Sequence, residues 1–528
     1  MTDCDWSFPY PSQRMPVLAE NVVATSQPLA AQAGLRMLLD GGNAVDAALA
    51  AAIALTVLEP TANGIGSDAF AIVWDGDRLH GLNGSGRSPA ALTPEHFDGR
   101  ESVPRLGWDA VTVPGAVSTW TALSEQFGRL PFERLFEPAI RYAADGYPVA
   151  PINGTAWRNS AKSYAEFPPF LDTFCPGGTA PGPGEWFRSP DIARTLGEIA
   201  ETNGESFYRG ELARRIAEYA AETGGLITQE DLGSHTADPV EPISIDYRGL
   251  TLHEVPPNGQ GIAALIALGI LANRPVGDCP VDSPDSLHLQ IEAMKLAFAD
   301  AQRYVADPDH MEPVADGLLD PGYLLERAER IDMARAGDPA FGLPGGSDTV
   351  YLAAADADGM MVSFIQSCFL SFGSGIVVPG TGIAFQNRGL GFTLEPGHPN
   401  RVGPSKRPYH TIIPGFISSG GKPVAAFGVM GGSMQPQGHV QVVVRLADYG
   451  QNPQAAIDSP RWRIKDGRQV LLERGTSQDV IDDLRGRGHQ VTVAGPGAFG
   501  GAQFIGTLAE GGYQAASDPR KDGQAVGF

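Results

Sequence analysis

The chain has 528 residues, of which 42% are hydrophobic, and it contains 66 glycines and 43 prolines. This size and composition predict a large globular protein with many turns. The formal net charge of −23 at pH 7 disfavours nucleic acid and anionic membranes as partners, because both would be repelled over the whole surface.

The beginning of the chain has no basic segment followed by an apolar run, the pattern typical of a secretion signal. We therefore expect a cytoplasmic protein. Four cysteines lie far apart with no CxxC pair, as suits a reducing compartment. The ten histidines show no HExxH pattern, so the sequence indicates neither a metal nor another cofactor. The cysteines are Cys4, Cys175, Cys279 and Cys368.

Helical patterns dominate the first half of the chain. The alanine-rich run 44–58 is interrupted by Asp46 and is shorter than the ~20 residues that span a bilayer. It therefore predicts a buried helix, with Asn43 as its N-terminal cap. The other helices predicted by apolar periodicity cover 28–39, 115–127, 132–144, 189–200, 210–223 and 286–305.

Predicted strands lie between these helices and dominate the last third of the chain. With no internal repeat and no convincing linker, the pattern indicates helices packed over sheets in one continuous fold. The predicted strands cover 69–74, 240–247, 350–355, 361–366, 382–385, 412–417, 424–427, 470–472 and 491–493.

A GxGxxG match at Gly495, Gly497 and Gly500 follows a strand, as a dinucleotide-binding turn would. The residues after it, 502–506, predict another strand. A helix N-terminus that could hold pyrophosphate is therefore not expected there.

The segment LPGGSDTVYLAAADADGMMVSFIQS places a glycine-rich loop before Thr349 and a strand hairpin after it. If the bond between Asp348 and Thr349 were cut, Thr349 would carry both a hydroxyl nucleophile and an α-amine. Such an amine titrates near ~7.7–8.0 and can act as the base for its own side chain. The alternative is that Thr349 is simply a strand residue after an ordinary loop.

A pair of glycines, Gly431 and Gly432, follows a predicted strand in FGVMGGSMQPQGH. Successive amides without side-chain hindrance could point at a developing oxyanion. The alternative is a tight turn.

Several longer motifs follow one another along the chain: GGNAVDAALAAAIALTVLEPTANGIGSDAF, TVPGAVSTW, NGESFYRGELA, GGLITQEDL, PPNGQG, the Thr349 hairpin, FGSGIVVPGTGIAFQNRG, RPYHTIIPGF and GVMGGSMQPQGH. In this order they resemble the γ-glutamyltranspeptidase family over nearly the whole chain. The likeness is greatest to bacterial glutathione hydrolase-like proenzymes that lack a secretion signal.

The resemblance implies an N-terminal-nucleophile hydrolase of the α+β class, with a four-layer αββα sandwich. It implies a precursor that cuts itself before Thr349 into a large subunit, 1–348, and a small catalytic subunit, 349–528. The two would stay together as one structural unit, a heterodimer, and two heterodimers could pair. Ser367 falls where the family keeps a hydroxyl that orients the threonine amine, and Gly431 and Gly432 would stabilise the oxyanion.

The residues expected to bind substrate depart from the family pattern. The family's arginine for the glutamyl carboxylate aligns near Ser85, so Arg87, two residues on, could supply the charge. The carboxylate that anchors the substrate α-amine is replaced by Gly391, and Arg388 stands at a neutral position. His410 and Thr411 replace a pair of substrate-holding serines.

These departures leave three hypotheses open. The first is a γ-glutamyltransferase or glutathione hydrolase acting through a threonyl acyl-enzyme. The second keeps this chemistry but makes the protein an amidase for carboxylate-bearing amides of glutaryl or oxalyl type. The third is an unprocessed binding protein in which Thr349 has no catalytic role.

Overall fold

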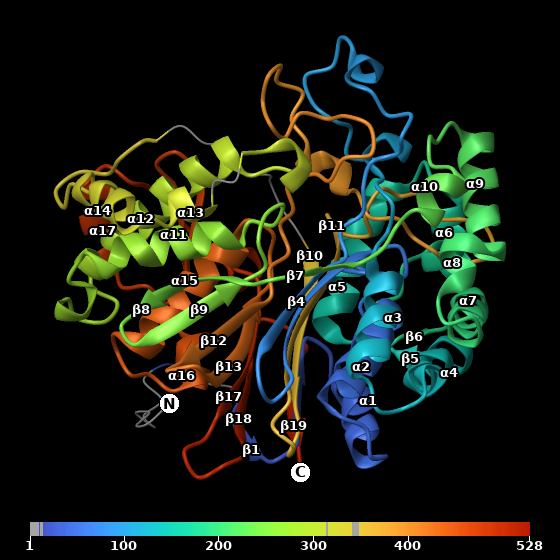
Figure 1. Cartoon of the computed structure of the whole chain (residues 1–528), viewed down its shortest axis with the longest axis horizontal. Helices are drawn as coiled ribbons and strands as arrows, with labels where there is room; N and C mark the ends of the chain where they lie inside the picture. The colour runs from blue at the N-terminus through green and yellow to red at the C-terminus, as the bar shows by residue number, and fades with distance from the viewer. Residues whose placement is uncertain (1–9, 11–13, 313–314, 340–347) are drawn as a thin grey trace.

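The structure, a computed structural model, describes residue 10 and residues 14–312, 315–339 and 348–528. Two seven-stranded sheets lie face to face at the centre of the molecule, and helices cover the outer face of each (Figure 1). This arrangement confirms the predicted α+β fold with four layers, αββα.

The first sheet interleaves strands from distant parts of the chain. Its central pair, β10 and β11, lies between β2 and β3, and neighbouring strands in it run antiparallel. A cut before Thr349 would therefore leave strands of both products hydrogen-bonded within one sheet. In spatial order its strands are β19 (Gln524–Gly527), β2 (Val22–Thr25), β10 (Asp348–Ala355), β11 (Met361–Phe369), β3 (Asp68–Trp74), β4 (Leu79–Asn83) and β7 (Asp238–Val240).

The second sheet is also antiparallel and is likewise assembled from distant segments. Its spatial order is β1 (Val17–Ala19), β18 (Tyr513–Ser517), β17 (Ala502–Thr507), β13 (Lys422–Val429), β12 (Gly415–Ser419), β9 (Leu250–Glu254) and β8 (Ile243–Tyr247). Two small sheets complete the strands: β5 (Tyr147–Pro148) with β6 (Trp186–Phe187), and β14 (Trp462–Asp466), β15 (Gln469–Glu473) and β16 (Gln490–Ala494).

The helices divide between the two outer faces according to their place in the chain (Figure 1). On the side of the first sheet lie α1 (Pro28–Leu39), α2 (Ala44–Leu58), α3 (Ala116–Phe127), α4 (Glu137–Asp145), α5 (Pro151–Ala161), α6 (Pro168–Phe174), α7 (Pro190–Glu201), α8 (Glu205–Arg209), α9 (Glu211–Thr223) and α10 (Gln229–Gly233). On the side of the second sheet lie α11 (Gly261–Ala272), α12 (Pro284–Tyr304), α13 (Ala315–Leu318), α14 (Pro321–Glu329), α15 (Met434–Ala447), α16 (Pro453–Asp458) and α17 (Gln478–Gly486).

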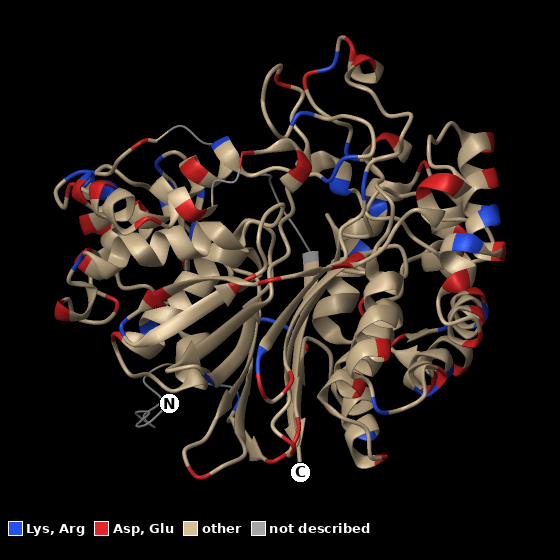
Figure 2. Cartoon of the chain, viewed as in Figure 1, with Lys and Arg blue, Asp and Glu red and all other residues tan. Residues whose placement is uncertain are grey.

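The core has three apolar layers, one between the sheets and one beneath each helical layer. Strand β10 contributes to two of them, since its side chains alternate between faces. Val350 and Leu352 pack under the helices of the first sheet, whereas Tyr351 and Ala353 pack between the sheets. Acidic and basic residues concentrate on the outer helices and loops, and the central strands carry few of them (Figure 2).

Most predicted elements are confirmed within a residue or two. The helices at 28–39 and 44–58 have the predicted bounds. The Asn43 side chain accepts from the amides of Val45 and Asp46, and the Asp46 carboxylate accepts from the Asn43 amide, which closes a capping box. Helix α2 is buried all round, as its uniform apolar sequence requires.

Two predicted strands are wrong. The run 240–247 is not one strand but belongs to β7 of the first sheet and β8 of the second, because Pro242 between them has no N–H for a ladder. The segment 382–385 forms only single bridges at Ala384 and Phe385, and Gly382 has a φ of +69° that interrupts an extended chain. The GxGxxG segment is followed by strand β17, as expected.

Among the described helices, none combines the length and the apolar character needed to cross a bilayer. The cysteines Cys175, Cys279 and Cys368 are free thiols, while Cys4 lies outside the described residues.

Candidate active site

Thr349 lies at the start of β10, where the pairing with β11 is irregular. Asp348 pairs with Phe369 and Val350 with Gln366, so the register shifts across Thr349. Such bulges re-aim a side chain. The Thr349 side chain is fully buried, and its Oγ1 donates a hydrogen bond to Ser367 Oγ at 3.3 Å. The structure therefore brings the predicted nucleophile and its predicted orienting hydroxyl together.

Ser367 is fixed from a second side, because its Oγ accepts from the Phe369 amide at 2.8 Å. Across the sheet, Ser367 pairs with Asp68, the first residue of β3. Asp348 and Thr349 are consecutive residues of β10, so this is the uncleaved chain. In this form the Thr349 nitrogen is an amide and has no basic character.

The two glycines Gly431 and Gly432 form the turn between β13 and α15. Both have positive φ, +118° and +62°, a backbone that disfavours other residues. A side chain on Gly431 would also press on Gly500, 3.2 Å away. The α15 N-terminus follows directly, and its dipole adds positive potential at the turn. The amides of this turn can therefore serve an oxyanion without side-chain interference.

Gln260 holds this turn in place. Its buried Nε2 donates to the carbonyl oxygens of Gly432, at 2.8 Å, and of Thr411, at 2.5 Å. One amide group thus ties the glycine turn to the segment that carries His410 and Thr411. Gln260 belongs to the PPNGQG motif, but sequence reasoning gave it no role, because its two contacts lie over 150 residues away.

Arg388 is a buried cation with unused donors. Its side chain is 1% exposed, its Nη1 donates to Thr411 Oγ1 at 2.7 Å, and its guanidinium lies 4.8 Å above the Phe369 ring. Its Nε and Nη2 have no hydrogen-bond partner among the described residues. Burial lowers the pKa of Arg388 to about 10, against the attraction of Asp68, so the group remains charged at neutral pH.

His410 and Asp68 form a buried pair beside this cation. Their Nε2 and Oδ2 atoms are 3.0 Å apart, and the Ile412 amide donates to His410 Nδ1. The hydrogen-bond pattern therefore assigns the proton to Nε2, which donates to Asp68. Burial, reinforced by the Arg388 charge, drives the pKa of His410 well below its usual value, so the ring is neutral. Burial also raises the pKa of Asp68 to about 7.

Asp68 is the site residue that sequence reasoning missed. It lies within the motif GIGSDAF, but nothing local marks it as functional. The available signal was an acidic residue opening an otherwise apolar strand. Only the pairing of β3 with β11 shows that it lies opposite Ser367.

Arg87 is bonded to residues outside the group formed by Arg388, His410 and Asp68. The Arg87 guanidinium is held by Asp307 at 2.8 Å and Asp309 at 3.0 Å, and it also donates to the Ser405 carbonyl. Its role in carboxylate binding therefore stays a prediction, and two protein carboxylates already compete for it. At Gly391 an added Cβ would lie 2.3 Å from the Tyr409 carbonyl, so the backbone leaves no room there for an anchoring carboxylate.

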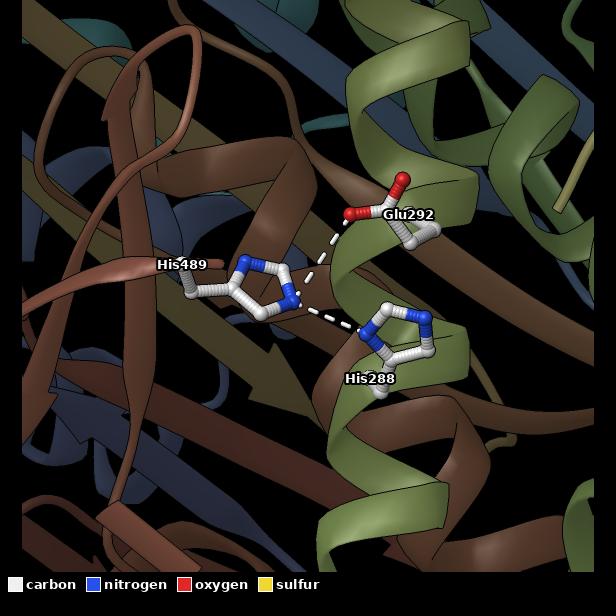
Figure 3. A group of neighbouring side chains, drawn as sticks. All are labelled: His288, Glu292 and His489. Carbon is white, nitrogen blue, oxygen red and sulfur yellow. Dashed lines mark hydrogen bonds and ion pairs between the residues drawn. The ribbon is translucent and has the colours of Figure 1, made fainter. Parts of the chain in front are cut away.

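One cluster outside this site has side chains typical of a metal centre. His288 and Glu292 lie one turn apart on α12, and His489 approaches them from the loop after α17 (Figure 3). The ligand atoms of these buried residues lie within 4.8 Å of one another. A zinc ion accepts such a donor set.

A lysine already occupies the place of the cation in this cluster. Lys295 Nζ donates to Glu292 Oε1 at 2.8 Å and to the Gly337 carbonyl at 3.0 Å, and it lies 3.5 Å from His489 Nδ1. His489 can then donate from Nε2 to His288 Nδ1 at 2.8 Å, and His288 to the Asp332 carbonyl. Since each ring nitrogen has a partner, the residues fit a closed structural network better than a metal.

A family model described as gamma-glutamyltranspeptidase matches residues 30–528. The chain belongs to this family. A glutathione hydrolase-like proenzyme of Bacillus subtilis is 38% identical over 519 residues, covering 96% of this chain and 98% of that protein. An oxamate amidohydrolase proenzyme of Klebsiella pneumoniae is 36% identical and covers 95% and 97%. The resemblance stated from the motifs is thus confirmed.

The fold agrees with this assignment. The crystal structure of a cephalosporin acylase from Bacillus halodurans superposes with a TM-score of 0.94 at 50% identity, and the match covers 100% of this chain and 99% of that one. The family comprises hydrolases and acyltransferases, and the relatives named above are proenzymes. The chain is therefore an enzyme of the N-terminal-nucleophile type.

Proposed function

We propose that this enzyme cuts its own chain before Thr349 and then hydrolyses a small-molecule amide whose acyl group carries a carboxylate. The products of the cut, residues 1–348 and 349–528, form a heterodimer because β10 and β11 stay within the sheet that also holds β2 and β3. We expect the enzyme in the cytoplasm. Two heterodimers could pair, and sedimentation of the purified enzyme tests this.

The mechanism follows from the groups around Thr349. After cleavage the new α-amine takes the proton of the Thr349 hydroxyl as its oxygen attacks the amide carbon. The amides at Gly431 and Gly432 stabilise the oxyanion, and a single such donor typically contributes ~2.7–4 kcal/mol. The C–N bond then breaks, the leaving amine takes the proton, and water hydrolyses the acyl-enzyme by the same steps. Ser367 orients the amine by a hydrogen bond.

The observation that carries the substrate proposal is the Arg388 guanidinium, buried with its Nε and Nη2 unpartnered. Leaving buried charged donors without acceptors is costly. A substrate carboxylate supplies two acceptor oxygens in the fork geometry that a guanidinium prefers. Thr411, which already contacts Nη1, fixes the orientation of this fork.

The favoured donor is a dicarboxylic monoamide of glutaryl or oxalyl type. At Gly391, where the family pattern has a carboxylate for the α-amine, the backbone leaves no room for one. The Klebsiella relative is named for oxamate, itself an amide that carries a carboxylate. The second candidate is a γ-glutamyl amide such as glutathione, favoured by the names of other relatives and by the Asp68 carboxylate near Arg388.

The test compares two chromogenic anilides with the mature enzyme, glutaryl p-nitroanilide and γ-glutamyl p-nitroanilide. They differ only in the α-amino group. We expect the higher kcat/KM with the glutaryl substrate at pH 6–7. A clear preference for the γ-glutamyl substrate across that range would overturn the dicarboxylic assignment, and failure to turn over either would overturn the carboxylate-bearing donor.

A further inference from the structure

We propose that Asp68 determines which acyl donors the site accepts. When protonated it admits a donor whose acyl end carries only a carboxylate, and when ionised it admits a donor that carries an α-ammonium group as well. This inference rests on the function proposed above and identifies a residue that chooses between its two candidate substrates.

The position of Asp68 supports this role. Its strand neighbour is Ser367, whose hydroxyl contacts Thr349. Its Oδ1 accepts from the Gly115 amide at 3.0 Å and its Oδ2 accepts from His410. Because the side chain is wholly buried, its charge is weakly screened by water and acts strongly on nearby groups.

When Asp68 is ionised, the positive and negative charges in its surroundings nearly cancel. The two cations that lower its pKa are Arg388 and Arg407, and Arg407 is already paired with Asp238 at 2.7 Å. The other titratable side chains around it are neutral: His410, as argued above, and Cys368 and Tyr208, whose pKa values are raised by burial. In the mature enzyme the Thr349 α-amine adds one more titratable group, beside Ser367. The ionised Asp68 is therefore the counter-charge of Arg388, although the two groups attract each other without forming a hydrogen bond that would use the open donors of Arg388.

A substrate carboxylate bound to Arg388 would upset this balance. Two buried carboxylates would then depend on the charge of one guanidinium, and like charges at close range force one of them to take a proton. A donor with only a carboxylate therefore requires Asp68 to be protonated. A donor with an α-ammonium group brings its own positive charge, so the site stays balanced with Asp68 ionised.

The direction of the pH dependence follows from this balance. In the uncut chain burial raises the pKa of Asp68 to about 7, and a group of this pKa is mostly protonated below neutral pH and mostly ionised above it. Between pH 6 and 8 the protonated fraction falls about tenfold and the ionised fraction rises about tenfold for a group of this pKa. The preference for glutaryl over γ-glutamyl donors should therefore fall about 100-fold over this range.

The experiment measures kcat/KM for the two anilides from pH 6 to 8 and takes their ratio at each pH. Titration of the Thr349 amine affects both reactions alike and cancels in the ratio. We expect a ratio that falls about 100-fold in the wild type. In Asp68→Asn we expect a pH-independent ratio at or above the wild-type value at pH 6, with γ-glutamyl turnover weakened. A constant ratio in the wild type would overturn the inference.

The matched control is Glu254→Gln. Glu254 is another fully buried acid whose carboxylate bonds a histidine, His439, at 2.6 Å, and burial raises its pKa as well. Its variant should keep the wild-type slope, and loss of the slope there would show that any buried acid gives the effect. If Asp68→Asn does not mature, the wild-type profile still decides. Turnover of both substrates at a constant ratio rejects only the role of Asp68, whereas turnover of neither rejects the proposed function.

Discussion

Two buried clusters, each with a cation at its centre, use their hydrogen bonds differently. Around Lys295 the ammonium, the Glu292 carboxylate and two imidazoles bond one another and the backbone. Around Arg388 two guanidinium nitrogens have no partner among the described residues. Among the described residues the first cluster is complete, whereas the second leaves two donors open, as the proposed binding of a substrate carboxylate requires. The number of hydrogen-bond partners of the buried cation therefore distinguishes these two clusters better than their residue types do.

The largest expected effect is at Thr349, the proposed nucleophile. Thr349→Ala removes the attacking oxygen, so the chain should stay uncut at 55.7 kDa and amide hydrolysis should fall by roughly four orders of magnitude or more. Denaturing electrophoresis and anilide turnover check this. Two fragments from the variant would mean that the nucleophile lies elsewhere.

The next effect concerns the glycine turn. Gly431→Ala forces a side chain onto a backbone with φ of +118° and places a Cβ 3.1 Å from that of Met434 and 3.2 Å from Gly500. Moving one oxyanion donor should lower kcat by about 10²–10³-fold and slow self-cleavage, while KM changes little. Gly497→Ala, where an added Cβ meets nothing within 4 Å, is the control. A normal kcat in Gly431→Ala would remove this turn from the mechanism.

Replacing Arg388 tests the comparison between the two clusters. Arg388→Met keeps the length of the side chain but removes the charge, and we expect kcat/KM for glutaryl p-nitroanilide to fall about 100-fold, mostly through KM. Arg87→Met should change it less than about threefold, because Arg87 is bonded to Asp307 and Asp309. The reverse ranking would move the carboxylate site to Arg87.

The smallest effect on catalysis is expected from a change in the cluster around Lys295. Lys295→Met leaves Glu292 buried beside two imidazoles without its counter-charge, which should cost about 3–5 kcal/mol of stability and lower the urea midpoint. The kcat of the folded enzyme should stay within about twofold. Zinc should not restore the midpoint of the variant, and recovery with zinc would show that the cluster is a metal site after all.

The sequence predicted the parts of the molecule that depend on local patterns. The capped helix at 44–58 and the hairpin after Thr349 follow from periodicity and turn residues, and the motifs predicted Ser367 beside Thr349. What it could not show depends on long-range pairing: Asp68 reaches Ser367 only through the contact of β3 with β11. The sequence could not show that two donors of Arg388 lack acceptors, because this depends on which residues lie near Arg388 in the fold.

The most direct test of the account is the intact mass of the purified protein, with N-terminal sequencing of its fragments. The account predicts two chains, of which the smaller begins Thr-Val-Tyr-Leu at Thr349. A single chain of 55.7 kDa that stays uncut for days in an otherwise folded sample would contradict it and favour a binding protein in which Thr349 is only a strand residue.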